Sequence, residues 1–169
     1  MALSFLTSSD ATIEVVVSCD PEVKADSESV SKYLQTGNLD ELENIGNATK
    51  FTLKALSPSE REAAEVKAGA MTRSELGRLL WVEAPTDTRE RARWHHALSD
   101  DEREAMSQYN SYLNRVYIEM IRAGLTMIDS KPGSVDDIQQ IRPDAHRAQT
   151  ISELVLHLQR ISLLGTEGK

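Results

Sequence analysis

The sequence predicts a predominantly helical α+β protein, with a small N-terminal β element followed by a helical bundle. Two short stretches, 12–18 and 50–56, alternate apolar and polar residues at the period of half-buried strands. After the second stretch, apolar residues recur at steps of three and four, as in amphipathic helices. Because 169 residues suit one well-buried core, we expect a single domain over 1–169. Its β-containing part is 1–56 and its helical part is 57–169.

The two predicted strands each gather their apolar side chains on one side. Ile13, Val15 and Val17 alternate along the first stretch, and Phe51 and Leu53 alternate along the second. Such half-buried strands are stable only when they pair, because a lone strand leaves its backbone groups without partners. We therefore expect the two strands to pair with each other.

The connection between the strands is polar and contains one short amphipathic segment. Val30, Tyr33 and Leu34 lie at helical spacing, and Gly37 follows them as a C-terminal stop. The rest of the connection, 38–49, is rich in asparagine and contains a glycine. These residues favour an exposed loop.

Capping boxes mark the starts of the predicted helices. In a capping box a serine or threonine is followed three residues later by a glutamate, and each side chain accepts a backbone N–H of the first helical turn. Four segments carry the pattern: 57–60, 72–75, 99–102 and 150–153. The longest helix should run from about 100 to 128, and the last from Ile151 to Leu164 with Gly165 after it.

A single cysteine, Cys19, excludes a disulfide within the chain and is typical of a protein made in a reducing compartment. The first residues lack the basic region of a secretory signal. No apolar run approaches the ~18–20 residues that a membrane span requires. We therefore expect a soluble, cytosolic protein without membrane association.

The net charge of −8 is unevenly distributed. Residues 1–49 hold nine acidic and two basic side chains, whereas 50–97 hold seven acidic and nine basic ones. A nucleic-acid-binding protein concentrates positive charge on one face, because neutralising phosphates supplies most of its affinity. Only the arginines at 89, 91 and 93 hint at this, so nucleic acid is an unfavoured partner.

No catalytic, metal or cofactor site is predicted, and we expect a protein that is not an enzyme. Adjacent histidines such as His95 and His96 point about 100° apart on a helix and cannot hold one ion from one face. His157 with Glu153, one helical turn earlier, is the best metal-binding pair, and its alternative is a hydrogen bond on the helix surface. Acidic neighbours of Cys19 would raise its thiol pKa and disfavour a nucleophile.

Two surfaces are candidate protein interfaces. Trp94 lies among arginines, and both residue types are enriched at binding hot spots, although this tryptophan could equally cover the edge of the bundle. Trp81 is expected in the core. The last helix is more apolar than one buried face requires, so it is either buried on both sides or bound to a second chain. The predicted interface residues are Trp94, Ile151, Leu154, Val155, Leu156, Leu158, Ile161, Leu163 and Leu164.

Four segments of the sequence resemble small proteins encoded among the structural genes of tailed bacteriophages. They are CDPEV (19–23), VSKYLQTGNLDEL (30–42), TKFTLKALSPSERE (49–62) and the ending ISELVLHLQRISLLG (151–165). Proteins of this kind share an early acidic strand, a "YLxTGD"-like helix end and an "F-x-L-x-x-L-S-x-x-E-R" step from strand to helix. Asn38 stands where the helix end would carry aspartate.

The resemblance implies a non-enzymatic virion or virion-assembly protein, such as a neck, capsid-associated or tail-assembly-chaperone-like protein. Its partners would be other phage structural proteins, with a homo-oligomer as a further option. It would act in the host cytoplasm during assembly or in the virion. The alternative function is a small helical regulator that binds nucleic acid or a host protein.

Overall fold

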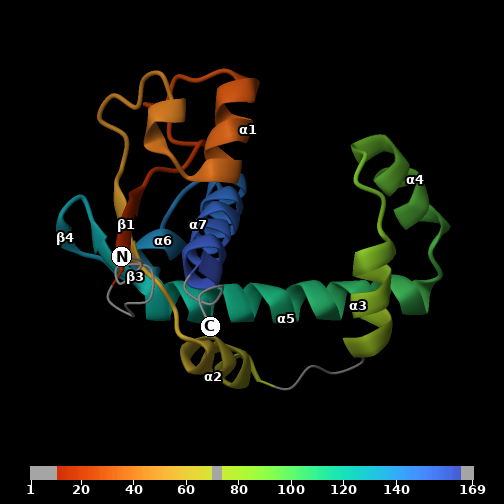
Figure 1. Ribbon diagram of the computed structural model, residues 1–169. Coiled ribbons are helices and arrows are strands. Elements are labelled where there is room, and N and C mark those ends of the chain that lie inside the picture. Colours follow the sequence, from red (N-terminus) through yellow and green to blue (C-terminus); the bar gives the residue numbers. More distant parts are fainter. Residues whose placement is uncertain (1–10, 70–73, 165–169) are drawn as a thin grey trace. The chain divides into compact units, whose positions relative to one another are not determined.

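The computed structural model describes residues 11–69 and 74–164 (Figure 1). It confirms the predicted fold class, a predominantly helical α+β protein with a small sheet. In chain order the elements are β1 (Thr12–Val15), α1 (Ser27–Thr36), the 3-10 helix η1 (Leu39–Glu41), β2 (Phe51–Lys54), α2 (Pro58–Ala68), α3 (Ser74–Glu83), α4 (Thr88–Ala97), α5 (Asp100–Gly124), β3 (Leu125–Ile128), β4 (Lys131–Pro132), α6 (Val135–Gln139) and α7 (Asp144–Leu164).

The described residues divide into two compact units. Unit 1 comprises 11–64 together with 117–164, and unit 2 comprises 65–116 without the four undescribed residues. The boundaries fall inside α2 and inside α5. Each unit is described by itself below, and the single domain expected over the whole chain stays a prediction.

The sheet of unit 1 is antiparallel throughout, with strand order β1-β2-β3-β4. The predicted pairing of the first two strands is confirmed, with Ile13 opposite Leu53 and Val15 opposite Phe51. Strand β1 is shorter than expected, although the next two residues, Val16 and Val17, remain buried. The apolar residues of this segment therefore continue into the core beyond Val15, the last residue of β1 that pairs with β2.

The third and fourth strands form a hairpin that the sequence analysis missed. A helix was expected to reach residue 128, and this was wrong, because α5 ends at Gly124 and β3 follows at once. The turn residues Asp129 and Ser130 both have positive φ, at 49° and 64°, as a tight hairpin of type I′ requires. Turns of this type usually contain glycine, so the sequence Asp-Ser gives no signal for the turn.

The segment between β1 and β2 forms a small lobe with its own core. Helix α1 begins after Asp26, which accepts the N–H of Ser29, and it ends at Gly37 in a left-handed conformation, as predicted. The exposed loop expected after it was wrong in part, because that segment contains η1 and buries Leu42 and Ala48. These two side chains pack with Tyr33 and Val16 in the core of the lobe.

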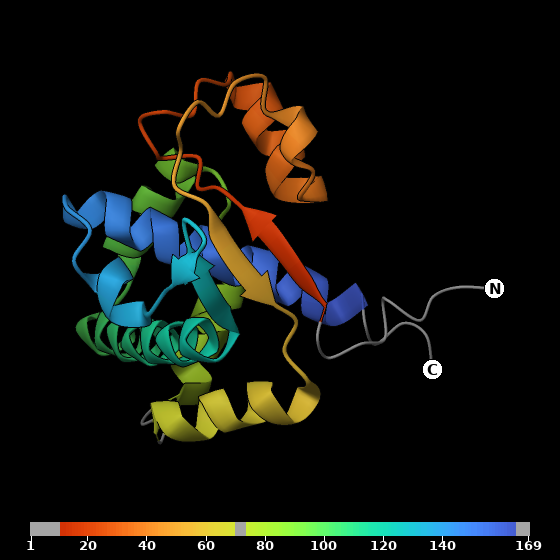
Figure 2. The ribbon, with the colours of Figure 1, turned by 90° about the vertical axis from the view of Figure 1, so that its left-hand side faces the viewer.

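Helix α7 is the central helix of unit 1 and packs against β1, β2 and α1 (Figure 2). It begins at Asp144, so the expected start near Ile151 and the capping box at 150–153 were wrong. Thr150 is buried in the middle of the helix. The carboxylate of Glu153 accepts the Ser18 N–H at 2.7 Å and its hydroxyl at 2.5 Å. Thr150 and Glu153 therefore contact other parts of unit 1 instead of capping a helix.

Two of the predicted capping boxes are present. The Ser57 hydroxyl accepts the Glu60 N–H at 3.2 Å, and the Glu60 carboxylate accepts the Ser57 N–H at 2.8 Å. Ser99 and Glu102 repeat the arrangement at 3.3 and 2.8 Å. The box at 72–75 lies outside the described residues.

Removing the cap hydroxyls should destabilise the protein measurably. We expect Ser57→Ala and Ser99→Ala each to lower the free energy of unfolding by about 1 kcal/mol, the usual cost of losing an N-cap oxygen. Urea unfolding followed by circular dichroism measures the change. Curves that overlay the parent's would show that these hydroxyls do not hold the helix starts.

Unit 2 has a small core of Leu80, Leu98 and Met106, with Trp94 packed against it. Helix α3 approaches α5 at Gly77, where an added Cβ would lie 2.8 Å from the Cβ of Tyr109. The expectation that Trp81 is a core residue was wrong, since 40% of its surface is exposed. Its ring instead contacts Tyr109 at the surface of the unit.

Candidate functional site

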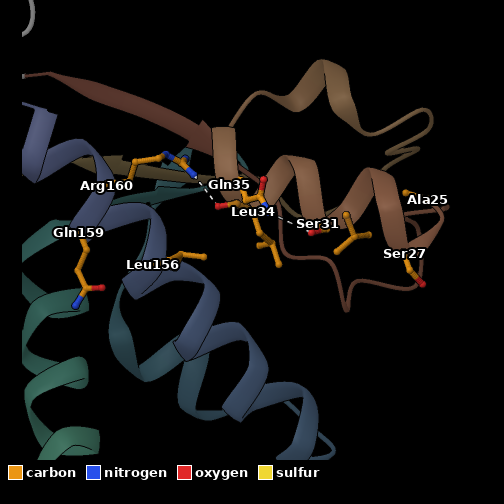
Figure 3. A pocket seen from close by; sticks show the side chains of 9 residues that line it. Ala25, Ser27, Ser31, Leu34, Gln35, Leu156, Gln159 and Arg160 are labelled. Carbon is orange, nitrogen blue, oxygen red and sulfur yellow. Dashed lines mark hydrogen bonds between the residues drawn. The ribbon is translucent and has the colours of Figure 1, made fainter. Parts of the chain in front are cut away.

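Unit 1 has an open groove between α1 and α7, with a volume of about 780 Å³. Helix α1 and the residues just before it supply one wall, and α7 supplies the other (Figure 3). Leu34 and Leu156 face the groove from the two sides. The lining residues are Ala25, Ser27, Val30, Ser31, Leu34, Gln35, Leu156, Gln159 and Arg160.

Arg160 joins the two walls of this groove. Its guanidinium donates to the carbonyl oxygen of Leu34 at 3.3 Å, at the end of α1, where carbonyls lack helical partners (Figure 3). The same guanidinium lies over Gly37, at the place that a side chain there would fill. Gly37 is therefore needed twice, for its positive φ of 72° and for the space that Arg160 occupies. Positive charge at a helix C-terminus also complements the helix dipole.

His157 lies beneath this contact and is fully buried. Its Nδ1 faces the Arg160 guanidinium at 2.6 Å and must accept, so Nε2 carries the proton. Its ring lies 5.1 Å from that of Tyr33. Burial, and then the nearby Arg160 charge, lowers the pKa of His157 from 6.5 to about 4, which keeps the imidazole neutral.

Neither interpretation of His157 with Glu153 was correct. The histidine is a core residue rather than a metal ligand or a surface hydrogen-bonding group. Glu153 turns instead to Ser18 and to Gln149, whose amide donates to it at 2.9 Å. Among the described residues, no group of three or more His, Cys, Asp or Glu side chains could hold a metal ion.

The groove is poor in charge. Charged residues make up 27% of the chain, but Arg160 is the one charged residue among the nine that line the groove. Its guanidinium is already engaged by His157 and by the end of α1. A mostly apolar lining with few charges and no acidic side chain resembles the central part of protein interfaces, which is depleted in charged residues.

The predicted interface on the last helix is largely internal. Ile151, Leu154, Val155 and Leu158 are buried within unit 1, so they have no surface to offer a partner. For these four residues the first of the two alternatives, burial within the fold, holds. Leu156 differs, with 40% of its surface exposed on the groove wall. Ile161 is half-buried, and the side chains of Leu163 and Leu164 lie outside those described.

Trp94, the other predicted interface residue, is half-buried on α4 against the small core of unit 2. This placement matches the alternative of a tryptophan at the edge of the helices. Most of the groove was not predicted from the sequence, including the places of Val30, Gln159 and Arg160 in it. Leu156 and the stop at Gly37 were the sequence signals close to it, but nothing local connects that glycine with Arg160.

A second cavity of unit 1, of about 240 Å³, contains Cys19 and His146. The cysteine Sγ contacts the backbone oxygen of His146 at 3.7 Å and the Thr150 hydroxyl at 3.6 Å. Burial raises the pKa of the Cys19 thiol, and the carboxylate of Glu153 raises it further. A protonated thiol is a poor nucleophile, so this cavity has no activated cysteine.

None of the described helices combines the length and the apolar character that crossing a membrane requires. Comparison of the chain with protein-family models, with curated proteins and with solved structures finds no match. The groove and its chemistry therefore carry the functional argument.

Proposed function

We propose that this chain is a non-enzymatic virion or virion-assembly protein of a tailed phage, and that it acts through protein–protein contacts at the groove between α1 and α7. The groove itself is the observation that carries the proposal. It is apolar, open and almost free of charge, and it exposes Leu156, whereas the other described leucine, isoleucine and valine side chains of α7 are buried or half-buried.

The segments that resemble phage proteins supply most of the groove. Seven of its nine lining residues lie in 30–42 or in 151–165. In the folded chain these two segments are brought together by the contact of Arg160 with the end of α1. The segments that resemble phage proteins and the groove thus share the same surface.

Such a groove suits an apolar helix of a partner. An amphipathic helix places anchors at every third or fourth residue on one face, and these can enter a groove between two helices. Leu156 is 40% exposed, so a partner that covers it completely gains about 1 kcal/mol, the corresponding share of the value for a fully exposed leucine. The uncharged serine and glutamine side chains of the lining can then form hydrogen bonds with the partner without the desolvation cost of burying ions.

The test is genetic and compositional. In a tailed phage that carries this gene, deleting it should strongly reduce the yield of infectious particles. Mass spectrometry should detect the protein in purified virions or in assembly intermediates, which separates a virion component from an assembly factor. A normal yield of infectious particles from the deletion strain, with the protein absent from both fractions, would overturn the proposal.

A further inference from the structure

We propose that His157 and Arg160 form an acid-sensitive switch, in which a proton on His157 releases the α1 lobe, residues 20–49, from α7. The switch controls whether the two walls of the groove stay together, so it goes beyond the proposed function and does not depend on what the groove binds. Two features carry it: the lobe is joined to α7 by one hydrogen bond, and the donor of that bond is held by a buried histidine.

Among the described residues, one hydrogen bond joins the α1 lobe directly to α7. The Arg160 guanidinium donates it to the Leu34 carbonyl oxygen at 3.3 Å (Figure 3). The other hydrogen bonds of the lobe stay within it or reach Val16 and Val17, just after β1. The lobe can therefore separate from α7 when Arg160 withdraws, while the sheet and the core of the lobe persist.

His157 fixes the position of this guanidinium. Its Nδ1 lies 2.6 Å from the Arg160 guanidinium and accepts from it, which it can do only while it carries no proton. A proton on Nδ1 would bring two positive charges into contact inside the fold, where water screens them weakly. His157 is fully buried, whereas Arg160 is half-buried on the groove wall. Arg160 is therefore the partner that can move out to solvent.

The surroundings of His157 offer no counter-charge for a second proton among the described residues. Its Nε2 has no hydrogen-bond partner. Burial raises the pKa of Tyr33, whose ring lies 5.1 Å away, to about 12, so that phenol stays neutral. The Glu153 carboxylate, one helical turn earlier, already accepts from Ser18 and Gln149.

The other charged side chains on the elements that pack against α7 are paired with each other or exposed. Because they are engaged elsewhere, Arg160 is the one charge that shifts the pKa of His157 among the described residues. The ion pairs are Glu28 with Lys32, Glu14 with Lys50, Lys54 with Glu60, and Glu119 with Arg122, and the exposed carboxylates of α6 are Asp136 and Asp137.

The size of the acid effect follows from the two states of the histidine. In the closed fold the pKa of His157 lies at about 4, through burial and then through the Arg160 charge. A solvated histidine titrates near 6.5, so the open lobe takes up a proton that the closed lobe does not. The equilibrium constant for opening should therefore rise about 20-fold between pH 7 and pH 5.

Amide hydrogen exchange measured by NMR follows this opening residue by residue. Dividing the exchange rate of an unstructured peptide by the observed rate gives a protection factor, which removes the effect of pH on the exchange chemistry. In the parent, the amides of Tyr33 and Leu34 on α1 should be less protected than those of β2, which exchange when the whole unit unfolds. Their protection should fall about 20-fold from pH 7 to pH 5.

His157→Asn keeps an acceptor for Arg160 but does not titrate. Its α1 protection should therefore change less than about threefold over the same pH range. His146→Asn is the matched control, because it removes a half-buried histidine of α7 that lies outside this contact. This control should keep the pH dependence of the parent.

Arg160→Met tests the switch from the other side, and it decides the matter if His157→Asn does not fold. It removes the hydrogen bond to Leu34, so at pH 7 the α1 amides should lose at least about tenfold in protection relative to those of β2. Arg147→Met is the matched control. It removes a guanidinium of α7 that donates to the Gln139 carbonyl oxygen and leaves the α1 lobe untouched.

Several results would overturn the switch. Equal protection of α1 and β2 at every pH would show that the lobe separates only when the whole unit unfolds. Protection of α1 that stays constant between pH 7 and pH 5, or that falls equally in the parent and in His157→Asn, would show that opening does not expose His157. Parental α1 protection in Arg160→Met would show that the guanidinium does not hold the lobe.

Discussion

Replacing Tyr33 with phenylalanine is expected to lower the free energy of unfolding by about 2–4 kcal/mol. The Tyr33 hydroxyl donates to the carbonyl oxygen of Val16 at 2.8 Å and accepts the N–H of the same residue at 3.1 Å. Both residues are fully buried. Phenylalanine keeps the ring but leaves two buried backbone groups without partners, and each costs roughly 1–3 kcal/mol. Urea unfolding followed by circular dichroism measures the loss.

Tyr112→Phe is the matched control, because it removes the same hydroxyl from a partly buried tyrosine of α5. Its expected effect is below about 0.5 kcal/mol, as for most substitutions near the surface. If the two variants were equally stable, the Tyr33 hydroxyl would not connect the α1 lobe with the end of β1, and the support for the groove wall would have to come from apolar packing alone.

Lowering the pH from 7 to 5 is expected to destabilise the folded chain by about 2 kcal/mol through His157. The folded imidazole has a pKa of about 4, against 6.5 for an unperturbed group. Between these values the unfolded chain binds a proton that the folded chain cannot bind. Above about pH 6.5, burying the neutral His157 therefore costs no stability through proton binding. As the pH falls from there toward 4, the free energy of unfolding decreases progressively.

His157→Asn isolates this contribution. The amide oxygen of asparagine can accept the hydrogen bond that Nδ1 accepts from Arg160, but the side chain does not titrate. Urea unfolding of both proteins at pH 7, 6 and 5 gives the comparison, and the variant should lose less stability than the parent by about 2 kcal/mol over this range. Equal losses in both would show that His157 accepts a proton in the folded state.

The elements with local signals could be predicted from sequence. Alternation at 50–56 followed by the Ser57 capping box defines the step from β2 to α2, since both signals lie within a few residues of the structure they specify. The hairpin of β3 and β4 lacked such a signal. Leu125 and Ile128 continue the apolar spacing of the preceding helix, so periodicity alone extends that helix through the strand.

The groove could not be predicted because its parts meet only in the tertiary structure. Arg160 and the Leu34 carbonyl are 126 residues apart in sequence, and their contact decides where α1 meets α7. The same holds for Glu153, which looks like a capping residue but binds the backbone of Ser18. A helical wheel of the last helix finds its apolar residues but cannot say that Leu156 alone faces a groove while Val155 is buried.

Rescue of a deletion phage tests whether this chain works through protein contacts at the groove. The measurement is the titre of infectious particles when the gene is supplied in trans as the parent, as Leu156→Glu or as Ala148→Glu. The parent and Ala148→Glu should restore the titre, because both keep the groove apolar. Leu156→Glu, with folding verified by circular dichroism, should fail to restore it. Full rescue by folded Leu156→Glu would contradict the account.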